Sequence, residues 1–151
     1  MNMRRAEEVQ FLNARGETTR EEAVVPITCD TDIVAARQKS RELAGKMGFS
    51  FLELTLIATA VSELARNIVV YGSGGEIRLR LAENGTHKGI VVVAQDKGRG
   101  IADIAKALQD GYSTSGSLGL GLPGTRRLMD EFEIVSAVGK GTTVTVKKWK
   151  R

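Results

Sequence analysis

Residues 62–72 read SELARNIVVYG, and this stretch fixes the central element of the fold. Apolar side chains recur before it at helical spacing, and SFLE at residues 50–53 has the pattern of a capping box. The glycine-rich sequence that begins at Gly72 makes a longer helix costly. We therefore predict one long amphipathic helix that ends here, with Glu63 and Asn67 one turn apart on the same face.

Around this helix the chain alternates between strand-like and helical patterns. Residues 76–83 alternate apolar with charged side chains, which indicates a strand with one wet face, and residues 89–95 are apolar, as in a central strand. Further strands are predicted at residues 23–29, 133–138 and 142–149. Further helices are predicted at residues 101–108 and 122–132, and another is predicted to begin at a cap formed by Asp30 or Thr31 and to end at Gly48. The pattern predicts an α/β (α+β) two-layer sandwich, in which helices cover one face of a mixed, largely antiparallel sheet.

Length and composition limit the class of protein. The 151 residues suit one domain, residues 23–151, preceded by a polar extension at residues 1–22. No apolar run approaches the roughly 20 residues of a membrane span, and the N-terminus lacks the apolar core of a secretory signal. We therefore predict a cytoplasmic protein that makes no contact with a membrane. The lone Cys29 excludes an intramolecular disulfide and is expected to be buried.

The formal net charge of +4 raises the alternative of nucleic acid binding. The basic residues are scattered, apart from the run KKWKR at residues 147–151, which is typical of a solvated chain end. We therefore expect no nucleic acid partner and keep nucleic acid binding as the weaker alternative.

Glu63 and Asn67 form the first pair of side chains with a chemical use. An amide oxygen can ligate Mg²⁺, and a carboxylate one turn earlier can accept a proton from an attacking hydroxyl or water. The plainer interpretation of the pair is a polar stripe on an amphipathic helix.

Two glycine turns follow predicted strands. In DKGRG at residues 96–100, Asp96 can accept a hydrogen bond from an adenine amino group while Gly98 and Gly100 let the ring approach the backbone; the alternative is a plain tight turn. In GKGT at residues 139–142, the Thr142 hydroxyl can share the contact with the base; the alternative is a plain hairpin.

A third glycine-rich segment, GLGLPG at residues 119–124, contains GxGxxG. A dinucleotide-binding fingerprint requires a preceding strand, but DGYSTSGS at residues 110–117 has no strand character. The remaining motifs of eukaryotic-type protein kinases are missing from the sequence. The segment therefore indicates a helix N-terminus that binds phosphate, with Ser113, Thr114 and Ser115 in a lid before it.

In this order the four segments resemble the N, G1, G2 and G3 boxes of the GHKL superfamily, whose ATP-binding domain is the Bergerat fold. The phrases DIVAARQ, SELARNI, DGYSTSG, GLPGTRRLMDEF and GKGTTV are most similar to the RsbT-like switch serine/threonine kinases of the bacterial stressosome. The resemblance covers residue 31 to residue 151. It implies that ATP and Mg²⁺ are bound and that phosphate is transferred to a protein serine or threonine.

The resemblance also implies a role for individual residues. Asn67 would bind Mg²⁺, Asp96 would read adenine, and Glu63 would be the general base. The pocket would be shaped by Gly98, Gly100, Gly119, Gly121 and Thr142, with Thr143 as an alternative to Thr142. Arg66 and either Arg126 or Arg127 are second-rank candidates for contacts with phosphate.

The partners implied by the resemblance are STAS-domain proteins, RsbS-like and RsbR-like, as substrates, and a PP2C-type phosphatase or another output protein; a homodimer is left open. No histidine is placed as a phosphoacceptor before the N box, which argues against a histidine kinase. Two rivals remain within the fold: an anti-sigma factor kinase that sequesters a sigma factor, and a nucleotide-gated binding module that transfers no phosphate.

Overall fold

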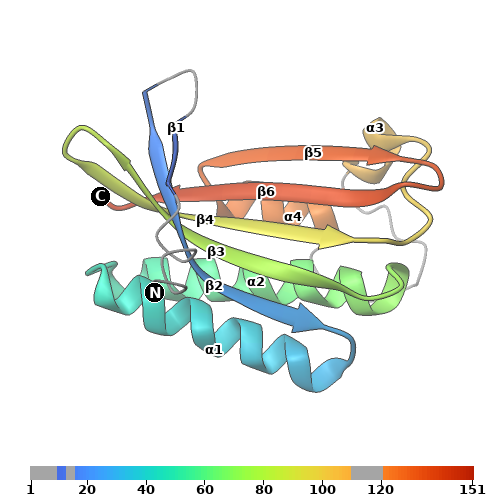
Figure 1. Ribbon diagram of the computed structural model, residues 1–151, viewed down its shortest axis with the longest axis horizontal. Coiled ribbons are helices and arrows are strands. Elements are labelled where there is room, and N and C mark those ends of the chain that lie inside the picture. The colour runs from blue at the N-terminus through green and yellow to red at the C-terminus, as the bar shows by residue number, and fades with distance from the viewer. Residues whose placement is uncertain (1–9, 13–15, 110–120) are drawn as a thin grey trace, which may run out of the picture.

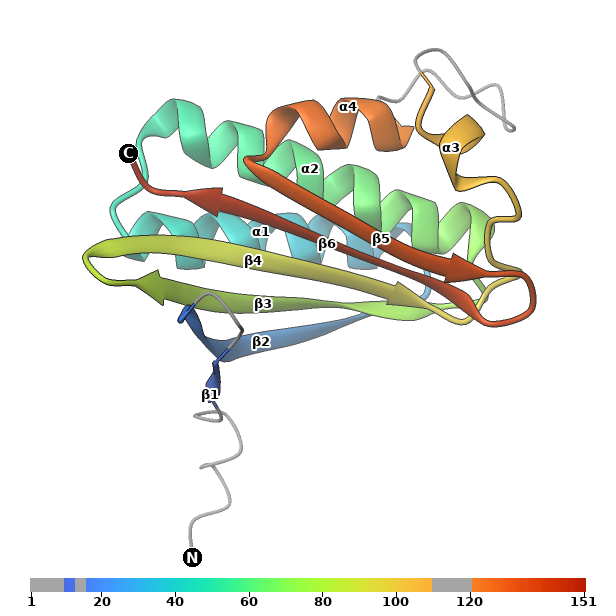
Figure 2. The ribbon, with the colours of Figure 1, turned by 90° about the horizontal axis from the view of Figure 1, so that it is seen from above.

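The computed structural model describes residues 10–12, 16–109 and 121–151, which form a two-layer sandwich (Figure 1). The strands are β1 (Gln10–Leu12), β2 (Thr18–Ile27), β3 (Gly75–Asn84), β4 (His87–Asp96), β5 (Glu131–Ala137) and β6 (Gly141–Trp149). The helices are α1 (Asp30–Lys46), α2 (Phe51–Tyr71), α3 (Ile104–Ala107) and α4 (Gly121–Leu128). The sheet order is β1-β2-β3-β4-β6-β5, and each of these neighbouring pairs is antiparallel. The predicted sandwich is confirmed: α1, α2 and α4 lie on one face of the sheet (Figure 2).

Helix α2 is the centre of the core. Its buried face packs against the alternate strand residues that point toward the helices, and each such apolar side chain contributes about 1.5–3 kcal/mol. The largest of these side chains are Ile57, Val61, Leu64 and Ile68 from α2, and Ile27, Ile77, Leu79, Ile90, Val92 and Val146 from the sheet. Within the described residues α2 is also the one helix long and apolar enough to cross a membrane by length and composition. The core helix of a folded domain has the same length and composition, and α2 occupies that position.

The helix starts test the predicted caps. The capping box of α2 is confirmed: Ser50 Oγ accepts the Glu53 N–H at 3.1 Å, and the Glu53 carboxylate accepts the Ser50 N–H at 2.9 Å. The predicted cap of α1 is wrong, because the N-cap is Cys29 and not Asp30 or Thr31. Asp32 reaches back and accepts the Cys29 N–H at 3.2 Å, which sets the start of the helix there. Cys29 is therefore exposed at a helix end, against the prediction that it is buried.

Several element boundaries also differ from the prediction. Strand β2 begins at Thr18, ahead of the predicted residue 23, because its polar start pairs with β3 and the Glu21 carboxylate accepts a hydrogen bond from Arg78 at 2.9 Å. Helix α3 is a single turn. Helix α4 ends at Leu128, and the next residues enter β5, since pairing with β6 competes with continued helix.

Candidate functional site

The C-terminal half of α2, the end of β4 and the β5–β6 hairpin meet at one end of the sheet (Figure 1). Asp96 is the last residue of β4 and is paired with Thr142, the second residue of β6. Paired residues of antiparallel strands share a face, and the preceding pair on that face, Ala94 with Val144, lies in the core under the helices. Asp96 and Thr142 therefore both face the helix layer.

This geometry separates the two threonine candidates. Thr143 is paired with Gln95, so its side chain lies on the opposite, uncovered face of the sheet. Of the two, Thr142 alone shares a face with Asp96.

Glycines let the segments around Asp96 approach closely. A Cβ on Gly72, at the end of α2, would lie 2.6 Å from Asp96 Cβ, and a Cβ on Gly98 would lie 2.8 Å from the Cα of Gly72. The Gly98 N–H donates to Asp96 Oδ1 at 2.8 Å. Gly100 has a φ of 79° and packs against the carbonyl of Ala137, at the end of β5. The predicted tight turn is therefore present, and it orients one oxygen of Asp96.

Ser136 is a residue of this region that the sequence analysis missed. Its hydroxyl accepts the Ile101 N–H at 2.8 Å, lies 2.7 Å from Thr142 Oγ1 and donates to the Gly141 carbonyl at 3.1 Å. The signal was present in EFEIVSA, where a polar Ser follows two apolar residues, Phe132 and Ile134, at the inward positions of an alternating strand.

Glu63 links α2 to the start of α4. Both Glu63 and Asn67 are half-buried on α2, and Glu63 Oε2 accepts the Gly121 N–H at 3.3 Å. The structure thus joins the predicted general base to the glycine segment, although the two lie far apart in the sequence. Gly119 and the predicted lid residues Ser113, Thr114 and Ser115 lie outside the described residues. The second-rank candidates Arg66, Arg126 and Arg127 are exposed.

The chemistry of these side chains suits a nucleotide with a divalent cation. Asp96 and Thr142 can receive an amino group at the end of β4, while the first turn of α4 can offer N–H groups to phosphate. The described residues contain no group of three His, Cys, Asp or Glu side chains that could hold a metal ion by themselves. The Asn67 amide oxygen is a side-chain oxygen on α2 that could be a ligand of Mg²⁺, which prefers oxygen ligands.

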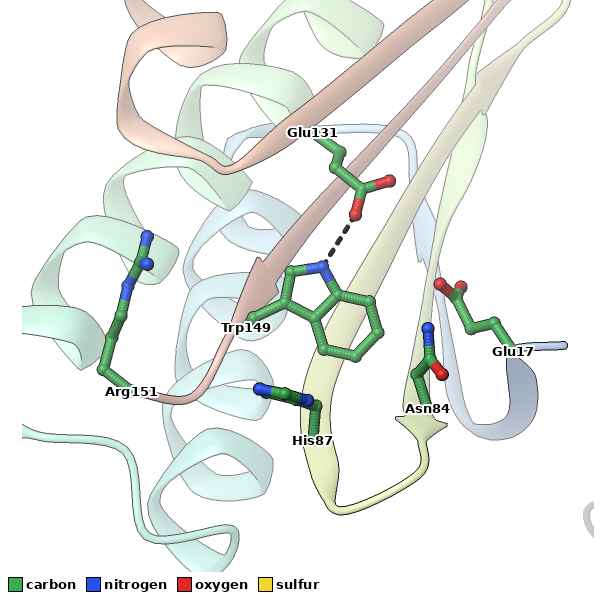
Figure 3. Close-up of a pocket in the computed structure, with 6 residues that line it drawn as sticks. All are labelled: Glu17, Asn84, His87, Glu131, Trp149 and Arg151. Atoms are coloured by element: carbon green, nitrogen blue, oxygen red, sulfur yellow. Dashed lines mark hydrogen bonds between the residues drawn. The ribbon is translucent and has the colours of Figure 1, made fainter. Parts of the chain in front are cut away.

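A pocket of about 340 Å³ lies at the other end of the sheet (Figure 3). It is lined by Glu17, Asn84, His87, Glu131, Trp149 and Arg151, and the indole N–H of Trp149 donates to Glu131 at 2.7 Å. Asn84 and His87 face each other at the turn end of β3 and β4, whereas Asp96 is at the far end of β4, about 30 Å away at the rise of a strand. This pocket is therefore separate from the site around Asp96.

The fold is that of an ATP-binding domain of the kinase type. Residues 25–148 match the family described as Histidine kinase-like ATPase domain, and the chain belongs to that family. It is 47% identical over 131 residues to the serine/threonine-protein kinase RsbT of Bacillus subtilis (strain 168), which covers 87% of this chain and 98% of that protein. By class it is a serine/threonine-protein kinase of the RsbT type.

Two further similarities agree with this family. The chain is 33% identical over 120 residues to the anti-sigma F factor of Thermoanaerobacter sp. (strain X514), which covers 76% of this chain and 82% of that protein. The crystal structure of the RsbU and RsbW domains of a Mycobacterium tuberculosis protein superposes with a TM-score of 0.56 at 23% identity. That match covers 85% of this chain but 33% of the solved one, so this chain spans about a third of its length. It supports the fold alone.

Proposed function

We propose that this kinase is a cytoplasmic partner-switching enzyme that phosphorylates serine or threonine on STAS-domain proteins, RsbS-like and RsbR-like, and then binds a PP2C-type phosphatase or another output protein. The observation that carries the proposal is the hydrogen bond from the Gly121 N–H to Glu63, since it brings a carboxylate to the helix that would hold the phosphates. The 47% identity to RsbT supports serine or threonine as the acceptor.

In this proposal the two ends of the site have different tasks. Asp96 and Thr142 receive the adenine ring, with Gly98 and Gly100 shaping the turn beside it. Gly121, together with Gly119 upstream, shapes the segment that holds the phosphates at the start of α4. Asn67 holds Mg²⁺, which neutralises charge on the phosphate oxygens.

Glu63 acts on the acceptor hydroxyl. The acceptor oxygen forms a bond to the γ-phosphorus of ATP as the bond from that phosphorus to the β–γ bridging oxygen breaks, and ADP leaves. The hydroxyl proton passes to Glu63, which is the reason that a carboxylate is needed beside the phosphates.

A phosphotransfer assay tests the proposal directly. The purified chain is incubated with labelled ATP, Mg²⁺ and the STAS-domain proteins encoded in the same genome. We expect one of them to be phosphorylated on serine or threonine and then to release the kinase, because a phosphate group adds a charge of about −1.5 to −2 at the contact. A complete absence of transfer to every such protein would contradict the proposal.

The anti-sigma factor relatives favour a second candidate function. At 33% identity over 120 residues they share the same ATP-binding fold, so a sigma factor is the alternative partner. A pull-down that captures a sigma factor tightly, with no transfer to STAS-domain proteins, would replace the first proposal with this one.

A further inference from the structure

The Ser136 hydroxyl contacts three polar groups from two segments, the loop after β4 and the start of β6: the Ile101 N–H, the Thr142 hydroxyl and the Gly141 carbonyl, at 2.8, 2.7 and 3.1 Å. A hydroxyl has one hydrogen to donate and two lone pairs that accept. The carbonyl can only accept and the N–H can only donate. Ser136 therefore gives its hydrogen to Gly141, accepts from Ile101, and has one lone pair left for Thr142.

This count assigns a direction to the hydrogen bond between the two hydroxyls. All three contacts of Ser136 can be hydrogen bonds at the same time only when Thr142 is the donor in the 2.7 Å contact. Its only hydrogen then points toward β5, away from Asp96. Toward the ring-binding side, Thr142 presents lone pairs alone.

We propose that Ser136 is a positioning residue that makes Thr142 an obligatory acceptor and so selects adenine over guanine. The inference rests on the proposed function, in which a nucleotide base lies against Asp96 and Thr142. Adenine carries an amino group at the position where guanine carries an oxygen. An acceptor-only hydroxyl beside the Asp96 carboxylate attracts the amino group and repels the oxygen, so the wrong base is rejected as well as the right one held.

The surrounding backbone holds this arrangement in place before any base arrives. The loop after Asp96 is fastened to the β5–β6 hairpin by the Ile101 contact and by a hydrogen bond from the Gly139 N–H to the Arg99 carbonyl at 2.7 Å. Gly100 lies so close to the Ala137 carbonyl that a Cβ there would be 2.0 Å from its oxygen. A rigid loop reduces the ordering that binding requires.

Calorimetry with ADP and GDP tests the inference without turnover. The Ser136→Ala variant frees the Thr142 hydrogen, which can then turn toward the base and donate to a guanine oxygen. We expect the ratio of the GDP and ADP dissociation constants to fall about tenfold, the size of one hydrogen bond's net effect. Ser136→Thr keeps a hydroxyl and should keep the ratio. Ser136→Cys, a weak hydrogen-bonding group of similar size, should lower it and stands in if the alanine variant does not fold.

Two controls separate positioning from general damage. Ser40→Ala removes another buried hydroxyl, which donates to the Arg37 carbonyl at 2.7 Å on α1, and should leave the ratio unchanged. In a Thr142→Val background, Ser136→Ala should have no further effect on the ratio, because the hydroxyl through which it acts is gone.

The outcomes also distinguish this inference from the proposed function. If the parent protein prefers ADP and Ser136→Ala keeps that preference, or weakens ADP and GDP equally, the positioning role is wrong while the adenine site stands. If the parent protein binds ADP and GDP equally or binds neither, the adenine site itself is wrong, and the inference falls with it.

Discussion

Asp96 is the residue on which recognition of the base depends in the proposed site. Its Oδ1 is occupied by the Gly98 N–H, so an amide at this position would have to turn its nitrogen toward either that N–H or the base. We expect Asp96→Asn to weaken ATP binding by about 10- to 100-fold or more, since loss of a charged hydrogen bond costs about 1.5–3 kcal/mol before any clash is counted. Calorimetry measures the ATP affinity of the variant, and an unchanged affinity would show that Asp96 does not bind the base.

Glu63 should affect transfer rather than binding. Glu63→Gln keeps an oxygen that can accept the Gly121 N–H but cannot take the acceptor proton. We expect ATP affinity to be retained and single-turnover phosphotransfer to fall by about 10² to 10⁴. Glu42→Gln, on the exposed side of α1, is the matched control and should transfer phosphate at the parent rate. A Glu63→Gln variant with the parent's rate would move the base elsewhere.

Gly72 tests how closely α2 must approach Asp96. Its φ of −90° suits any residue, so only the lack of a side chain matters: an alanine Cβ would lie 2.6 Å from Asp96 Cβ. We expect Gly72→Ala to displace Asp96, to weaken ATP binding and to lower the free energy of unfolding by about 1–3 kcal/mol. Gly45→Ala, in α1 with nothing within 4 Å, should instead gain about 0.5–1 kcal/mol and bind ATP normally. Denaturation and calorimetry on both variants check this.

Among the elements, α2 depends on its capping box. We expect Ser50→Ala to cost about 1 kcal/mol in urea denaturation. The pKa of Glu53 lies below its usual 4.5, chiefly because the carboxylate accepts the Ser50 N–H. Because the pKa is lowered on folding, the ionised Glu53 carboxylate stabilises the folded state. This stabilisation is present above pH 4.5 and is lost as the pH falls through the lower pKa of the folded state. The difference in the free energy of unfolding between the parent and Glu53→Gln should therefore shrink as the pH falls below 4.5. A difference that stays constant with pH would contradict the prediction.

Elements with strong local signals could be predicted, and those set by tertiary pairing could not. Helix α2 carries its own cap and period, and the middle of β4, from Ile90 to Ala94, is apolar, so both were predicted close to their observed bounds. The start of β2 is polar and becomes a strand through its pairing with β1 and β3, which no local pattern indicates. In the site, Glu63 and Asp96 stand in recognisable motifs. Ser136 does not, because its contact with the Ile101 N–H joins residues 35 positions apart in the chain.

At the scale of the whole molecule, an ion pair on the uncovered face of the sheet connects the start of β2 to β6. Glu17 is 1% exposed and contacts Lys147, which also lies 3.7 Å from Glu131. We expect Lys147→Met to lower the free energy of unfolding by about 3 kcal/mol, since Glu17 keeps its buried charge and loses this ammonium.

The combined variant Glu17→Leu with Lys147→Met is the control for that prediction. Replacing both charges by apolar groups should recover most of the loss, as it often does for buried ion pairs. ATP affinity should not change in either variant, because Lys147 is paired with Val91, about 17 Å along β4 from Asp96, and its side chain lies on the opposite face of the sheet. If Lys147→Met alone is as stable as the parent, the ion pair contributes little to the free energy of unfolding.

Strand β6 occurs last among the described strands along the chain, yet it lies inside the sheet, between β4 and β5. During synthesis, α2 with Glu63 and β4 with Asp96 leave the ribosome before β6, the strand that contains Thr142. Until β6 inserts, one edge of β4 and part of the apolar face of α2 remain open to water, which is the kind of surface that chaperones protect. A prematurely terminated copy that ends before Gly141 lacks Thr142 and the inner strand of the sheet, so it should not complete the base site proposed above.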